Sequence, residues 1–116
     1  MSENKKTIEK YIDGFNTSDH KQILSCLTDD IIWEMPGAFH LEGKEEFDGE
    51  IENPNFEGKP VVTINRMTEE SNIVIVEGNV KGMKKGGQPF SASFCDVFEM
   101  QNNKIKKLIG YIAMVS

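Results

Sequence analysis

The clearest secondary-structure signal in the chain is the alternation in residues 90–100, Phe90-Ser91-Ala92-Ser93-Phe94-Cys95-Asp96-Val97-Phe98-Glu99-Met100. Successive residues of a β-strand point to opposite faces of the sheet, so the phenylalanines of this stretch share one face. Asp96 falls on that face too, with Phe94 and Phe98 as its neighbours two positions away. The stretch therefore predicts a strand that carries one acidic group among aromatic side chains.

The Asp96 carboxyl is the residue that breaks an otherwise apolar pattern. An isolated carboxylate in apolar surroundings is costly, and such a group usually protonates instead of staying charged. Each unit of upward pKa shift costs about 1.4 kcal/mol, so a large shift is seldom kept without a use. Two structural explanations compete with a functional one. A β-bulge would turn Asp96 to solvent, or a Lys or Arg would pair with it.

Around this stretch, the pattern of the C-terminal half predicts strands. Residues 61–67, 73–82, 89–100 and 105–115 are rich in β-branched and aromatic side chains. Turn-forming segments at 70–72, 84–87 and 101–103 separate them, which predicts antiparallel hairpins.

The N-terminal third reads as two helices and a strand. Apolar residues at helical spacing predict the first helix, and Ser18 or Asp19 can cap a second helix. In the strand that follows, Trp33 and Met35 share one face and Glu34 lies on the other, before Pro36 and Gly37 stop it. The apolar stripe of the first helix consists of Ile8, Tyr11, Ile12 and Phe15.

Residues 39–60 form the least regular part of the chain. We expect a short helix near 44–51 and then a loop that carries Pro54, Gly58 and Pro60. The whole chain, residues 1–116, then makes one α+β domain: a cone-shaped, curved antiparallel sheet with helices on one face. A pocket between the concave side of the sheet and the helices is the place to expect function.

Composition excludes several classes of function. The chain has 116 residues and a net charge of −6, which argues against binding to nucleic acid. Its apolar runs, such as residues 73–76, are too short to cross a membrane, and the polar N-terminus resembles no signal peptide, so we expect a cytoplasmic protein. His20 and His40 are too few and too far apart for a zinc site, so we expect no metal.

The order of elements, with Trp33-Glu34-Met35-Pro36-Gly37 ending the first strand, resembles the nuclear transport factor 2-like superfamily. Within it the chain is most similar to the SnoaL-like polyketide cyclases and the ketosteroid isomerases. The likeness spans nearly the whole chain and is most specific in residues 88–98, which are similar to the isomerase strand that bears an oxyanion-hole aspartic acid. The resemblance implies a homodimer that forms through the open face of the sheet.

The resemblance also implies catalytic roles. Tyr11 matches the isomerase tyrosine that donates a hydrogen bond to the substrate oxygen, and Asp96 matches the second, protonated donor. Glu34 lies nearest the catalytic base. In the isomerases the base directly precedes a proline, and here Met35 holds that position. Either Glu34 faces inward and moves a proton, or Met35 occupies the pocket and the base is missing.

The similarity to the cyclases offers a different use of the strand, in which Asp96 alone acts as acid and base during ring closure. Both versions describe a cofactor-free isomerase or cyclase that acts on a small hydrophobic carbonyl compound. The alternative is a non-catalytic protein of the same fold that binds a small hydrophobic ligand. The expected ligand contacts are Phe15, Trp33, Met35, Phe39, His40, Phe94 and Phe98. The simpler interpretations are that Trp33 is a core residue and that His40 is a solvated loop residue.

Overall fold

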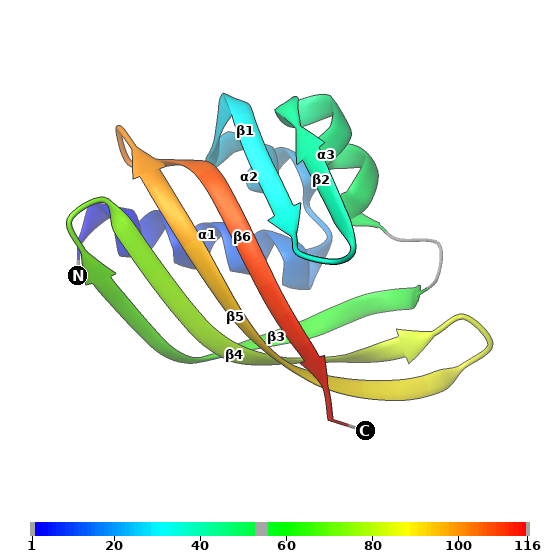
Figure 1. Ribbon diagram of the computed structural model, residues 1–116. Helices are drawn as coiled ribbons and strands as arrows, with labels where there is room; N and C mark the ends of the chain where they lie inside the picture. The colour runs from blue at the N-terminus through cyan, green and yellow to red at the C-terminus, as the bar shows by residue number, and fades with distance from the viewer. Residues whose placement is uncertain (1, 53–55, 116) are drawn as a thin grey trace.

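The computed structural model describes residues 2–52 and 56–115, and it places three helices against the concave side and one end of a curved six-stranded sheet (Figure 1). The predicted α+β fold with a curved sheet is confirmed. In chain order the elements are α1 (Glu3–Thr17), α2 (His20–Ser25), β1 (Leu27–Met35), β2 (Phe39–Glu42), α3 (Gly43–Ile51), β3 (Phe56–Glu70), β4 (Ile73–Lys84), β5 (Gln88–Gln101) and β6 (Lys104–Met114).

The strands follow the order β2-β1-β6-β5-β4-β3 across the sheet. The meander from β3 to β6 is antiparallel, as its turn residues predict, and so is the β1–β2 hairpin. The β1–β6 pair is parallel, so the expectation of a wholly antiparallel sheet is wrong at this one place. Parallel strands need a long connection, and here most of the chain lies between the two strands.

The helices begin and end where side chains can satisfy free backbone groups. Ser18 ends α1 in the left-handed conformation, and the Asp19 side chain accepts a hydrogen bond from the Gln22 amide at the start of α2. Of the two capping residues that the sequence allows, Asp19 caps α2. Gly14 lets the two helices approach, because a Cβ there would lie 2.7 Å from Ile23 Cγ1.

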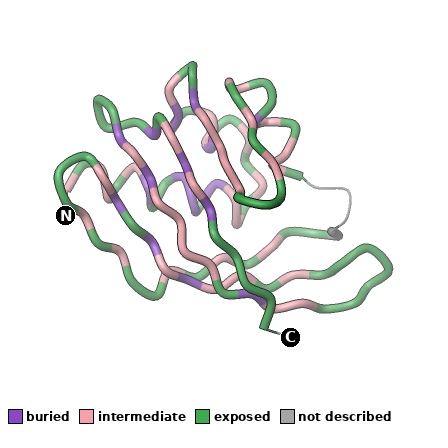
Figure 2. Tube along the Cα trace, viewed as in Figure 1, coloured by how far each residue is buried: buried purple, intermediate pink, exposed green. Residues whose placement is uncertain are grey.

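The core fills one end of the cone and leaves the other end open. Buried side chains gather on α1 and on the part of the sheet next to β1, whereas the far ends of β3, β4 and β5 are exposed (Figure 2). Asn16 fixes α1 above the edge strand, since its side chain exchanges two hydrogen bonds with the backbone of Val62 in β3. None of the helices within the described residues is long and apolar enough to span a bilayer.

The segment after β1 differs in part from its prediction. The helix expected near 44–51 is present as α3, but Phe39–Glu42 forms an edge strand beside β1 that the sequence did not predict. Gly58 and Pro60 lie in β3 instead of a loop, at a break in its pairing with β4 between Glu57 and Val61. Bulges on edge strands tolerate both residue types. Pro54 lies outside the described residues.

His20 joins α2 to α3. Its Nδ1 lies 2.6 Å from Oδ1 of Asp48, and its Nε2 lies 2.7 Å from Oε1 of Glu52. A neutral imidazole has one N–H, so only the imidazolium donates to both carboxylates. These hydrogen bonds raise the pKa of His20 above its ordinary value of 6.5.

The raised pKa predicts a pH-dependent contribution of His20 to stability. The contribution is complete below pH 6.5 and is lost as the pH rises through the raised pKa, because only the folded state holds the proton there. Replacing His20 with Ala should lower the urea midpoint at pH 6 and leave it nearly unchanged at pH 9.

His40→Ala is the control for this measurement. His40 contacts Glu34 and Glu42, but β1 and β2 are already joined by backbone hydrogen bonds, so this variant should change the urea midpoint less. Equal losses for His20→Ala at pH 6 and pH 9 would contradict the role of the charge.

Candidate functional site

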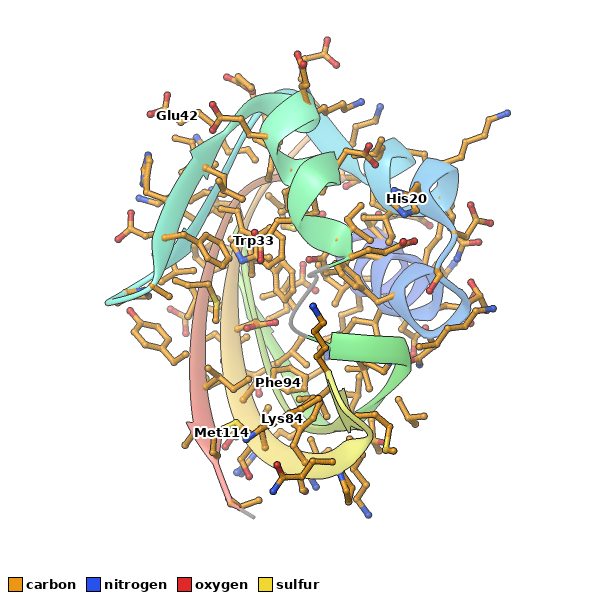
Figure 3. All side chains as sticks on the ribbon, turned by 90° about the vertical axis from the view of Figure 1, so that its right-hand side faces the viewer. His20, Trp33, Glu42, Lys84, Phe94 and Met114 are labelled. Atoms are coloured by element: carbon orange, nitrogen blue, oxygen red, sulfur yellow. The ribbon has the colours of Figure 1, made fainter. Side chains whose placement is uncertain are left out.

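A cavity of about 150 Å³ lies between α1 and the concave face of the sheet; we call it the inner cavity. Six of the residues that line it were singled out from the sequence: Tyr11, Phe15, Trp33, Met35, Phe94 and Asp96. Figure 3 shows Trp33 and Phe94 in the space between the sheet and the helices. Six others were not: Ile12, Val62, Val80, Leu108, Tyr111 and Ile112.

A wider cleft of about 540 Å³ adjoins the inner cavity at the open end of the cone; we call it the outer cleft. Phe15, Val80 and Ile112 border both spaces, so the outer cleft gives access to the inner cavity. The outer cleft lies within the usual size range of ligand sites, roughly 300–1,000 Å³.

The strand register explains why Asp96 points into the inner cavity. Asp96 pairs with Val76 of β4 on one side and with Gly110 of β6 on the other, without interruption around it. The irregularity between β5 and β6 comes later, between Glu99 and Met100. Asp96 therefore keeps the orientation of Phe94, and the β-bulge that would turn it to solvent is not present.

The second structural explanation also fails. Within residues 2–52 and 56–115, Asp96 forms no ion pair and its carboxyl accepts no hydrogen bond. Burial without a compensating charge raises the pKa of Asp96 from its ordinary value of 3.8 to about 7. The group therefore exchanges its proton near neutral pH.

Tyr11 reaches the inner cavity from α1 and is held by aromatic rings. Its ring meets those of Phe15, Phe98 and Phe47 edge-on, at centroid distances of 5.1, 5.6 and 6.2 Å. Burial, and then the nearby charge of Asp96, raise the pKa of Tyr11 well above its ordinary value. The phenol stays protonated, and in the described part of the chain it has no hydrogen-bond partner, so it can donate to a ligand oxygen.

Glu34 and His40 lie outside the inner cavity. His40 Nδ1 is 3.2 Å from Oε1 of Glu34, and its Nε2 is 3.1 Å from Oε2 of Glu42, on exposed parts of β1 and β2. Met35 takes the inward position instead. Of the two arrangements that the sequence left open, the structure has the one with Met35 in the lining of the inner cavity and Glu34 outside it. His40 likewise does not touch this space.

The remaining expected contacts support the lining instead of forming it. Phe98 is fully buried under the ring of Tyr11, and Phe39 packs against Trp33 with a centroid distance of 5.1 Å. Trp33 combines two roles, since it borders the inner cavity and also stacks on Phe47 of α3 at 4.5 Å. Among the described residues, no three His, Cys, Asp or Glu side chains lie together in a way that could hold a metal ion.

Two glycines of β4 mark part of the lining that sequence reasoning missed. Gly78 and Gly82 pair with Phe94 and Phe90 of β5, and both phenylalanine rings lie over the glycine opposite, 2.8 Å from where its Cβ would be. The spacing of Gly78 and Gly82 on the face of Val80 is visible in the sequence and was the available signal for a cavity wall on β4.

The fold and the cavity define a protein of nuclear transport factor 2-like, or NTF2-like, architecture, and comparison with solved structures agrees. An NTF2-like protein of unknown function from Burkholderia pseudomallei is 18% identical, with a TM-score of 0.91 over 97% of this chain and 92% of that chain. TerC, co-crystallized with polyporic acid, is 19% identical, with a TM-score of 0.87 over 94% of this chain and 90% of that chain.

A third similar structure is an epoxide hydrolase of the LEH-like type from M. tuberculosis, which is 18% identical, with a TM-score of 0.84 over 96% of this chain and 83% of that chain. Likeness at these identities shows the fold alone. The model of the SnoaL-like domain matches residues 8–108, and the chain belongs to that family. No curated protein matches it.

The shifted pKa of Asp96 predicts how stability depends on pH. The folded state holds the Asp96 proton up to about pH 7, and the unfolded state releases it near pH 4, so stability is lost as the pH rises between these values. About three units correspond to a loss on the order of 4 kcal/mol. Asp96→Asn should remove this loss and be more stable than wild type at pH 8, as measured by urea unfolding.

Asp30→Asn, which changes an exposed carboxyl on β1, is the matched control and should keep the pH dependence of wild type. Carbon-detected NMR of the Asp96 carboxyl measures the same quantity directly. A titration near pH 4 in the folded protein would contradict the assigned environment.

Proposed function

We propose that this protein is a cofactor-free enzyme for a small hydrophobic carbonyl compound, in which Asp96 acts as general acid and base and Tyr11 binds the carbonyl oxygen. The observation that carries the proposal is an unpaired carboxyl, with a pKa of about 7, in an otherwise apolar cavity. A group whose pKa lies near the working pH is suited both to accept and to return a proton.

The proposed reaction begins with an ionised Asp96. Its carboxylate takes a proton from the carbon next to the substrate carbonyl, and the electron pair of the broken C–H bond forms an enolate. The Tyr11 hydroxyl donates a hydrogen bond to the enolate oxygen, where the negative charge develops. Protonated Asp96 then returns the proton, either to a more distant carbon or to the oxygen of a second carbonyl.

The two possible destinations of the proton lead to different products. Proton return to another carbon moves a double bond and is an isomerisation. In a ring closure, the enolate carbon attacks a second carbonyl of the same molecule, and Asp96 protonates the new alkoxide. Asp96 is the only carboxyl among the described residues that line the inner cavity, so acid and base must be one group. This favours the version in which a single acid does both over one with Asp96 as a second oxyanion donor.

A size-matched assay tests the proposal. A cavity of 150 Å³ has room for one six-membered ring. We expect wild type to convert 3-cyclohexenone to its conjugated isomer, followed by the ultraviolet absorbance of the enone product, or to cyclise 2,6-heptanedione to its cyclic hydroxyketone, followed by NMR. Asp96→Asn should lower kcat/KM by roughly 10² or more, and Tyr11→Phe by roughly 10². The rate of wild type should rise with pH through about 7.

Glu34→Gln is the control, because Glu34 lies outside the inner cavity. This variant should leave the rates with both substrates unchanged. A rate that Asp96→Asn does not alter would refute the catalytic role of Asp96. A loss of kcat/KM in Glu34→Gln equal to that in Asp96→Asn would instead indicate that Glu34 is the base.

A second candidate function is binding without chemistry. It is favoured by Met35, an inert thioether where a second acid–base group would complete an isomerase-like site. In this case both ketones bind, and each is recovered unaltered after long incubation at pH 6 to 8. Product formed at a rate that depends on Asp96 decides for the enzyme.

We also propose that the chain forms a homodimer through the convex face. There Ile75, Val97 and Ile109 lie side by side on β4, β5 and β6, and Ile75 is 38% exposed. A row of this kind is costly to leave in water. Val97→Lys should shift the sedimentation coefficient of the protein to that of a monomer, whereas Lys81→Gln on the same face of β4, away from the row, should not. A monomeric wild type would refute the dimer.

A further inference from the structure

We infer that Met35, seated over Gly110, determines which carbonyl head groups can reach Asp96. The inference rests on the proposed function, because it concerns the group that would lie beside the reacting carbonyl. It makes Met35 and Gly110 a specificity-determining pair in the wall of the inner cavity. The substrate class it names is carbonyl compounds with a small substituent on one side of the carbonyl and a larger body on the other.

The strand register places the pair beside Asp96. Asp96 of β5 pairs with Gly110 of β6, and Glu34 of β1 pairs with Ile109 of β6, so Met35 follows next to Gly110. Neighbouring strands lie about 4.8 Å apart, so Met35 and Asp96 are separated only by the width of β6. Both side chains border the same cavity, and the position between them carries no side chain.

Distances around Gly110 show how this space is used. A Cβ on Gly110 would lie 2.5 Å from Met35 Sδ, 3.8 Å from Met35 Cε and 3.1 Å from Asp96 Oδ1. The thioether and the carboxyl therefore both lie over the glycine. Gly110 does not have positive φ, so a turn does not demand glycine at this position. Its role is to leave room for the Met35 side chain.

This arrangement restricts one end of a ligand and not the other. Towards the open end of the cone, the inner cavity continues into the outer cleft through the shared residues Phe15, Val80 and Ile112. On the side of β1, the Met35 side chain borders it. A ligand whose oxygen lies at Tyr11 and Asp96 can extend a ring or chain outward, but the substituent on the other side of its carbonyl meets the thioether.

Two phenyl ketones test the inference by binding alone. Acetophenone carries a methyl group beside its carbonyl, and isobutyrophenone carries an isopropyl group. We expect wild type to bind acetophenone more tightly, measured by NMR titration of the methyl signals of Ile12 and Val80. Met35→Ala should reduce the ratio of the two dissociation constants at least tenfold, since a few methylenes in an apolar pocket are worth 10- to 200-fold.

The effect of substituting Gly110 on ketone binding should depend on the residue at position 35. Gly110→Ala pushes the thioether into the inner cavity, so it should weaken the binding of both ketones when Met35 is present. In the Met35→Ala background the added methyl group fills vacated space, and the same change should restore part of the preference for acetophenone. The effect of Gly110→Ala therefore depends on the residue at position 35, an interaction between the two positions that a general loss of structure does not produce.

Met35→Leu is the matched control, because it nearly conserves volume and should keep the ratio within about threefold. Met35→Val removes fewer atoms than Met35→Ala and provides the same test if the alanine variant does not fold. A ratio of dissociation constants that neither the alanine nor the valine variant changes would overturn the inference, as would wild-type binding of both ketones with equal affinity.

The outcome is independent of turnover. If Asp96→Asn leaves the reaction rate unchanged while Met35→Ala still alters the binding ratio, the proposed catalysis fails and the role of Met35 stands. If Asp96→Asn abolishes turnover while the ratio does not respond to Met35, only the further inference fails.

Discussion

The parallel pairing of β1 with β6 is the constraint on which the site depends. Without it, the meander of β3 to β6 would be a curved ribbon with Asp96 near one edge. The pairing adds β1 beside β6, which places Trp33 and Met35 within reach of Asp96 and gives α3 a surface to pack on. Since β1 follows α2 directly, the same pairing holds the helices over the concave face. One pairing between distant parts of the chain therefore completes the sheet and supplies one wall of the cavity.

The fold surrounds Asp96 with apolar groups and supplies no counter-charge. Val76 lies beside it on β4, Phe94 and Phe98 lie two residues away along β5, and Tyr11 covers it from α1. The chain has 13 Lys and Arg residues, yet among the described ones none pairs with Asp96. A cation there would stabilise the protein and lower the pKa of the carboxyl. Without a cation near Asp96, the carboxyl keeps the raised pKa that suits proton transfer, and the folded protein is less stable for it, as is common at functional sites.

How much the sequence predicted depends on how far each element is constrained by its neighbours. The position of Asp96 followed from alternation because β5 is paired on both sides over most of its length. The orientation of Glu34 and Met35 did not, since both faces of β1 carry an apolar residue, Ile32 on one and Trp33 on the other. Contacts of Trp33 with Phe15 of α1 and Phe47 of α3 fix which face is inside, and such tertiary contacts are not encoded within β1.

Other features could not be read from the sequence for related reasons. Phe39–Glu42 is four residues long and exists as a strand only because β1 offers a partner. Tyr111 and Ile112 are neighbours on β6 that both border the inner cavity, which strict alternation forbids. They lie where the sheet flares toward its open end, so a residue of each parity reaches the opening. The curvature of the sheet is a property of all its strands together, and no single segment encodes it.

The single acid of the inner cavity depends on the uncharged side chain of Met35 beside it. A second carboxylate in place of Met35 would lie over Gly110 next to Asp96, and two like charges so close cannot both ionise. One of them would hold a proton far above neutral pH, and the roles of acid and base would be divided between two groups. The thioether adds no charge, so burial alone raises the pKa of Asp96 to about 7. A single carboxyl with a pKa in this range can both accept and return a proton. In a pair of carboxyls with widely separated pKa values, neither group can do both.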